Sequence, residues 1–263
     1  MLRFSSCMAP NMESMCRDIA GIAADCLGIE TMFVGDIDWQ ARERGFMHGA
    51  IDVLWICGLP YVWNWQSDRD AVELLVAPVM RAPRYEGRPV YYSDIVVRRG
   101  SGYRTFADLR GRRFVYNEPR SHSGYNVMRH HLAVSGSGSG YFGEVRESGA
   151  HQQSIEWILE GRADVAAVDS TVLELENERR YGLMDELAIV GTLGPSPMPP
   201  WIVRADLDPQ IKRALRSLLL TMHQDPRGAE VLAACRIRAF VRVDDDHYEP
   251  IRRMADEAAR VVL

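Results

Sequence analysis

The chain alternates short apolar runs with stretches in which apolar residues recur every three to four positions. The runs predict strands and the helical spacing predicts helices. In the first part, strands over 3–9, 31–34 and 51–57 are predicted to alternate with two helices. Asn11 is predicted to cap the first helix and Gly28 to end it, and the second spans 39–47. This order is typical of a sheet with helices on its faces.

The same order returns further along the chain. Strands are predicted over 94–97, 113–116, 142–146 and 165–168, with a Thr105 and Asp108 capping box between the first two. After a strand over 201–203, helices are predicted over 208–222, 226–234 and 248–261. We therefore predict an α/β fold of two doubly wound lobes with parallel sheets. The first lobe comprises 1–92 and 196–263, the second comprises 93–195, and the cleft between them is the expected ligand site.

Composition narrows the function classes. The 263 residues are 47% hydrophobic and 25% charged, and the formal net charge is −5 without a basic stripe. A nucleic-acid partner is therefore not expected. The five cysteines are scattered without paired spacing, so neither a zinc site nor a disulfide framework is predicted. The sequence also has no metal-ligand spacing and no cofactor-binding loop, so no metal and no cofactor are predicted.

The N-terminal sequence lacks the charged and apolar regions of a signal peptide, and no apolar run approaches a membrane span of ~20 residues. We expect no membrane insertion and a monomer. The location is expected to be cytoplasmic if Met1 is native, and periplasmic if a leader has been trimmed.

Residues 118–125 place Ser121, Ser123 and Gly124 between a predicted strand and the start of a helix whose apolar positions include Met128 and Leu132. The first-turn N–H groups of a helix lack internal partners and lie at the positive end of its dipole. Such a helix start binds phosphate, phosphonate or carboxylate groups. The alternative is an ordinary N-cap serine, which is common at helix starts.

Several motifs together resemble the phosphonate, phosphate and phosphite-binding proteins of ABC importers. The similarity covers most of the chain and is densest from about 91 to 171. It rests on the segments 91–97, 106–114, 121–125, 149–151 and 161–169, with a weaker match over 49–62. The resemblance implies a type 2 periplasmic-binding-protein fold and a small anionic ligand, with an ABC permease as a possible partner.

The resemblance also implies site residues. Ser121, Ser123 and Gly124 match the family's Ser-Thr-Ser-Gly helix start, which gives hydroxyls and N–H groups to the oxyanion. His122 replaces the threonine, so it either donates to the ligand or faces solvent. Tyr92 falls where the family offers a phenolic donor, with Tyr91 as the alternative and packing at the lobe junction as a structural explanation.

Three further positions have both a ligand-binding and a structural interpretation. His151 is implied as a ligand residue at a helix start, although a lone histidine is often structural. Asp169 follows an apolar strand and either faces the ligand or caps the next helix. Tyr61, with Trp63 and Trp65, forms either an aromatic wall or part of the core.

The sequence thus favours a non-catalytic solute-binding protein that captures a small phosphorus oxyanion in the cleft and closes by hinge motion. The alternatives are a cytosolic enzyme or a ligand sensor on the same fold. Ser121, His151 and Asp169 could form a catalytic triad, but their order in the chain gives no geometry.

Overall fold

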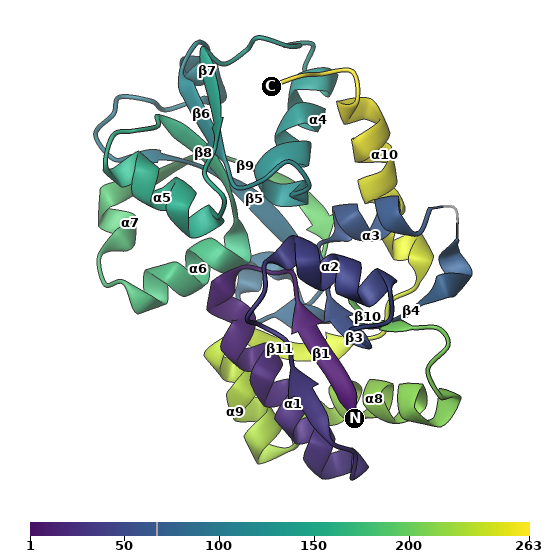
Figure 1. Ribbon diagram of the computed structural model, residues 1–263. Coiled ribbons are helices and arrows are strands. Elements are labelled where there is room, and N and C mark those ends of the chain that lie inside the picture. Colours follow the sequence, from purple (N-terminus) through teal and green to yellow (C-terminus); the bar gives the residue numbers. More distant parts are fainter. Residues whose placement is uncertain (67) are drawn as a thin grey trace. The chain divides into compact units, whose positions relative to one another are not determined.

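The computed structural model describes residues 1–66 and 68–263 (Figure 1). The chain divides into two compact units. The first unit comprises Met1–Val90 and Pro197–Tyr248, and the second comprises Tyr91–Ser196 and Glu249–Leu263. The chain therefore enters the second unit at Tyr91 and leaves it at Ser196. The sequence placed everything after 195 in the first lobe, whereas residues 249–263 belong with the second unit.

The first unit is built on a sheet with the strand order β11-β4-β10-β3-β1-β2. Its strands are β1 (Leu2–Ser6), β2 (Thr31–Phe33), β3 (Val53–Trp55), β4 (Val72–Met80), β10 (Trp201–Arg204) and β11 (Ile237–Val241). Its helices are α1 (Glu13–Leu27), α2 (Trp39–Met47), α3 (Gly58–Asn64), α8 (Pro209–Thr221) and α9 (Pro226–Ala234). Short 3₁₀ turns cover Pro10–Met12, Arg69–Ala71, Pro83–Tyr85, Met222–Gln224 and Asp245–Tyr248.

Local signals set the ends of α1, which packs beside α9 (Figure 1). Gly28 ends the helix in the left-handed conformation at φ 62°, as predicted. The prediction that Asn11 caps α1 is wrong, because Pro10–Met12 forms a 3₁₀ turn and the helix begins after it. Deeper in the unit, Trp55 and Trp201 stack with ring centroids 5.6 Å apart and join β3 to β10 in the core.

The second unit has its own sheet, in the order β7-β6-β8-β5-β9. Its strands are β5 (Val90–Arg98), β6 (Arg113–Tyr116), β7 (Glu144–Glu147), β8 (Val165–Asp169) and β9 (Leu187–Pro197). Its helices are α4 (Val127–Val134), α5 (His151–Leu159), α6 (Ser170–Arg179), α7 (Leu183–Glu186) and α10 (Glu249–Ala258). A 3₁₀ turn covers Phe106–Leu109, and a π-helical turn, η5 (His122–Asn126), precedes α4.

Both sheets are mixed, which corrects the prediction of parallel sheets. β1 pairs in parallel with β2 and β3, but β10 is antiparallel to β3 and β4. In the second unit β6 is parallel to β7 and β8, while β5 is antiparallel to β8. The strand–helix alternation identified the parallel strands, whereas the antiparallel ones arise where the chain crosses between the units and carry no such signal.

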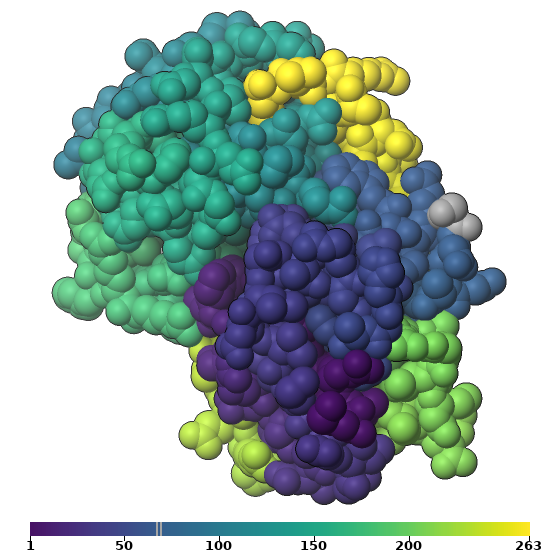
Figure 2. All heavy atoms as spheres, viewed as in Figure 1, coloured from purple at the N-terminus to yellow at the C-terminus, as the bar shows by residue number. Residues whose placement is uncertain are grey.

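The C-terminal segment joins the second unit through contacts with α4. Arg129 Nε donates to the Val261 carbonyl at 2.8 Å, and His130 Nε2 lies 2.8 Å from Glu257 Oε2. Val261 belongs to the buried cluster that also contains Phe114 and Met128. Figure 2 shows the yellow C-terminal residues lying on the teal surface of this unit. Among the described residues, no helix is long and apolar enough to cross a membrane.

Candidate functional site

The helix start at Ser121 has the predicted cap. Ser121 is extended, and its Oγ accepts a hydrogen bond from the Gly124 N–H at 3.0 Å. Its carbonyl accepts from the Asn126 N–H at 3.0 Å, which gives the first turn its π-helical form. A hydroxyl is one donor and two acceptors, so the cap leaves the Ser121 O–H available to donate. The capping role therefore does not exclude a role in binding an anion.

Ser123 is held on both sides within the second unit. Its Oγ lies 3.1 Å from Nε2 of His151, the first residue of α5. Its carbonyl accepts from Ser93 Oγ on β5 at 2.8 Å. Burial lowers the pKa of His151 to about 4, so its imidazole is neutral near pH 7. The structure thus brings Ser123 and His151, two predicted site residues, into direct contact.

Gly124 is required by the close approach of two side chains. A Cβ added there would lie 1.9 Å from Asn117 Oδ1 and 3.1 Å from His151 Cε1. The Asn117 Oδ1 and His151 Nδ1 atoms are buried and have no hydrogen-bond partner among the described residues. Two unsatisfied polar atoms therefore gather beside the helix start. Sequence reasoning missed Asn117, although its place directly after β6 is a signal for a site residue.

His122 does not face solvent, so this part of the sequence interpretation is wrong. The residue is fully buried, and its Nε2 lies 3.0 Å from Ser196 Oγ. Its Nδ1 lies 3.2 Å from Asn126 Nδ2, and the Tyr91 ring meets it edge-on at 6.5 Å. Burial lowers the pKa of His122 to about 3. Both ring nitrogens are thus used inside the second unit, and a direct contact of His122 with a ligand stays a prediction.

Asp169 has the capping role that the sequence allowed. It ends β8, and its Oδ1 accepts from the Thr171 N–H at 2.8 Å and from Thr171 Oγ1 at 2.7 Å. Burial raises the pKa of the carboxyl to about 6. Asp169 also stands opposite Ser93 in the β5–β8 ladder, and Ser93 bonds to Ser123. Ser93 therefore links Asp169, its partner in the ladder, to Ser123 at the helix start.

The two neighbouring tyrosines of β5 differ in their surroundings. Tyr91 is buried against His122, whereas Tyr92 is half-buried and its backbone N–H donates to Ser170 Oγ at 3.0 Å. Because successive side chains of a strand point to opposite faces, Tyr92 is the more accessible of the pair. This supports Tyr92 over Tyr91 as the candidate phenol.

Tyr61 lies in the core of the first unit. Its ring packs on Tyr248 with centroids 5.0 Å apart, and its hydroxyl donates to Asp245 Oδ1 at 2.9 Å. Trp65 is buried beside it, while Trp63 is 39% exposed. The three aromatic residues therefore do not form one continuous wall within the unit, and Tyr61 has the packing role that the sequence left open.

The Ser123 and His151 pair lacks the third member of a catalytic triad. His151 Nδ1 has no carboxylate partner among the described residues, and the Asp169 carboxylate is bonded to Thr171. A histidine with a pKa of about 4 is also a weak general base. In residues 1–66 and 68–263, no group of three His, Cys, Asp or Glu could hold a metal ion.

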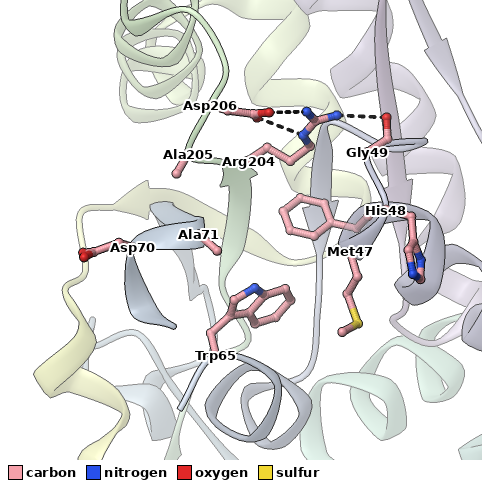
Figure 3. A pocket seen from close by; sticks show the side chains of 10 residues that line it. Met47, His48, Gly49, Trp65, Asp70, Ala71, Arg204, Ala205 and Asp206 are labelled. Carbon is pink, nitrogen blue, oxygen red and sulfur yellow. Dashed lines mark hydrogen bonds and ion pairs between the residues drawn. The ribbon is translucent and has the colours of Figure 1, made fainter. Parts of the chain in front are cut away.

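A cavity of about 580 Å³ lies in the first unit (Figure 3). Phe46 and Trp65 form its aromatic part, and Arg204 is among the residues that line it. Arg204 Nε donates to Asp206 Oδ1 at 2.9 Å, and its Nη1 donates to the Gly49 carbonyl at 2.9 Å. Because the guanidinium is already paired, this cavity offers an anion less than the helix start does.

Comparison with known proteins gives a match over most of the chain. A family model described as an ABC transporter, phosphonate, periplasmic substrate-binding protein matches residues 13–248.

Solved structures agree on the fold. A binding protein component of an ABC phosphonate transporter from Pseudomonas aeruginosa has a TM-score of 0.84 and 19% identity, covering 98% of this chain and 86% of that one. A Prochlorococcus marinus protein in complex with methylphosphonate has a TM-score of 0.85 and 16% identity, covering 99% and 98%. A Xanthomonas citri protein bound to ATP has a TM-score of 0.73 and 17% identity, and the match covers 98% of this chain and 97% of that one. The predicted type 2 periplasmic-binding-protein fold is confirmed.

Proposed function

The chain belongs to the periplasmic substrate-binding proteins of ABC phosphonate transporters, and from this premise we propose that it binds a small phosphorus oxyanion at the helix start around Ser121 and Ser123. The family implies a small ligand and an ABC permease as partners. We further propose that the protein holds its ligand without catalysis.

The observation that carries the proposal is the contact between Ser123 Oγ and His151 Nε2 at 3.1 Å. When the Ser123 hydroxyl donates a hydrogen bond to an anion, its oxygen must accept a hydrogen bond from His151 Nε2–H. The neutral imidazole supplies that donor and fixes the direction of the hydroxyl. At the other serine, the Gly124 N–H occupies an acceptor position of Ser121 Oγ and leaves its O–H free to turn to the ligand.

Neutral donors suit a small oxyanion in a buried place. Ser121 is 3% exposed and Ser123 is 4% exposed, so a bound anion loses much of its hydration. Hydrogen bonds to a charged group are worth about 1.5–3 kcal/mol each, and the helix dipole adds to them. The Asp169 carboxyl, with its raised pKa, is suited to accept a hydrogen bond from a protonated oxygen of the ligand.

The proposal is tested by calorimetry and thermal unfolding with methylphosphonate, phosphite and phosphate, with sulfate as the control anion. A ligand that binds the folded state alone raises the melting temperature by mass action. Replacing both serines with alanine should remove about 3–6 kcal/mol of binding free energy. The lost cap should cost about 1 kcal/mol of stability.

Ser135→Ala is the matched control, because Ser135 lies just after the other end of the same helix and bonds to the Leu132 carbonyl. It should leave affinity unchanged. If no phosphorus oxyanion shifts the melting curve or produces heat, the proposed ligand class is wrong. If the Ser121→Ala/Ser123→Ala variant binds within tenfold of the wild type, these serines are caps and the ligand binds elsewhere.

A further inference from the structure

His122 connects three parts of the second unit that are far apart in the sequence. It lies between the two serines of the helix start and contacts Tyr91 and Ser196 through its ring. Tyr91 is the first residue of this unit and Ser196 is the last before the chain returns to the first unit. The residue thus touches both segments by which residues 91–196 are joined to the rest of the chain.

The hydrogen bonds of His122 define its tautomer. The Asn126 amide nitrogen can only donate, so His122 Nδ1 accepts at 3.2 Å. The proton is then on Nε2, which donates to Ser196 Oγ at 3.0 Å. All three residues are at most 2% exposed, so solvent cannot replace either bond. A neutral imidazole, with one donor and one acceptor, is fully satisfied here.

We propose that His122 is a positioning residue that fixes the ligand-binding helix start to the two chain segments at Tyr91 and Ser196. The inference rests on the proposed function, because it assigns the ligand to Ser121 and Ser123. The backbone of His122 is continuous with both serines, so a shift of its ring moves their hydroxyls. Conversely, a ligand that orders the serines also orders the two segments.

Two amide substitutions separate the bonds of the ring. An asparagine side chain ends near the position of Nδ1 and can pair with Asn126, but it does not reach Ser196. A glutamine side chain reaches the position of Nε2 and can still donate to Ser196. His122→Gln should therefore preserve the function of the residue and His122→Asn should not.

The test measures methylphosphonate affinity by calorimetry and the melting temperature of the ligand-free protein. His122→Asn and Ser196→Ala should each weaken affinity by about tenfold, as expected for one buried hydrogen bond. The double variant should be no weaker than either single one, because both changes delete the same bond. His122→Gln should stay within about threefold of the wild type. His130→Asn, on the same helix, is the matched control and should bind as the wild type does.

Additive losses in the double variant, or lower melting temperatures without a change in affinity, would overturn the inference while the proposed function stands. Absence of methylphosphonate binding by the wild type would overturn both. A second measurement needs no variant. Methylphosphonate should slow amide hydrogen exchange at residues 91–93, Gly194 and Ser196 of the wild type, and unchanged exchange there would contradict the coupling.

Discussion

Replacing Gly124 with alanine tests the geometry of the helix start most directly. The added Cβ would lie 1.9 Å from Asn117 Oδ1, 3.0 Å from Asn117 Cγ and 3.1 Å from His151 Cε1. Because Asn117 Oδ1 has no hydrogen-bond partner in the described part of the chain, the Asn117 amide can turn away, but Cγ and the imidazole must also shift. Overpacking of this kind costs about 1–3 kcal/mol. The melting temperature should fall by roughly 2–4 °C per kcal/mol, and methylphosphonate should bind at least about tenfold more weakly.

Two further variants show whether the collision is the cause. Gly21→Ala is the matched control. Gly21 lies in the middle of α1, and a Cβ added there would be 3.7 Å from Arg227 Nη2, which is an ordinary contact distance. It should stabilise the protein by about 0.5–1 kcal/mol. Adding Asn117→Ala to Gly124→Ala should restore most of the lost stability. If Gly124→Ala melts and binds as the wild type does, the contact of Gly124 with Asn117 and His151 is not tight, and the reasoning fails.

Three other outcomes follow from individual side chains. The His151 pKa of about 4 lies below its ordinary 6.5, so the unfolded state binds more protons between these values, and stability falls as the pH drops through this window. His151→Asn should flatten this slope, by at most about 1.4 kcal/mol per pH unit, in melting curves recorded from pH 4 to 7. The Asp169 pKa of about 6 lies above 3.8, so its contribution has the opposite sign and is lost as the pH rises from about 4 to 6. Asp169→Asn should therefore gain stability relative to the wild type at pH 7 but not at pH 4, and an equal gain at both would contradict the raised pKa. Tyr61→Phe should lower stability by about 1 kcal/mol through loss of the bond to Asp245, with unchanged methylphosphonate affinity by calorimetry; weaker binding would return Tyr61 to the site.

Those parts of the fold that depend on local rules could be predicted from the sequence. Helix α9 has the predicted bounds, and α8 begins after Asp208 with a proline in its first turn, as predicted. The Thr105 and Asp108 capping box is also present. These features depend on residues within four positions of one another, so a short segment contains all the information.

The parts that depend on distant segments could not be predicted in the same way. Strands β4 and β11 pair with each other in antiparallel fashion across more than half of the chain length, and neither was predicted. The contact of α10 with α4 likewise depends on residues such as His130 and Glu257, whose sequence separation carries no periodic signal. The position of residues 249–263 in the second unit therefore becomes visible in three dimensions alone.

The same distinction between local and distant contacts applies to the candidate site. Ser121, Ser123 and Gly124 form one local motif, and their arrangement at a helix start follows from the sequence. Ser93 and Ser196 could not be assigned, because they reach the motif through strands β5 and β9, whose registers the sequence does not specify.

The two interpretations of Ser121 that the sequence left open are compatible in the structure. Its bond to the Gly124 N–H uses an acceptor position, while an anion needs the donor of the same hydroxyl. The cap also fixes the position of Oγ before a ligand arrives, which reduces the entropy lost on binding. Ser123 is held in the same manner by His151. A stable helix start and an oxyanion site therefore require the same serines, because the bonds that complete the helix are those that orient the hydroxyl donors.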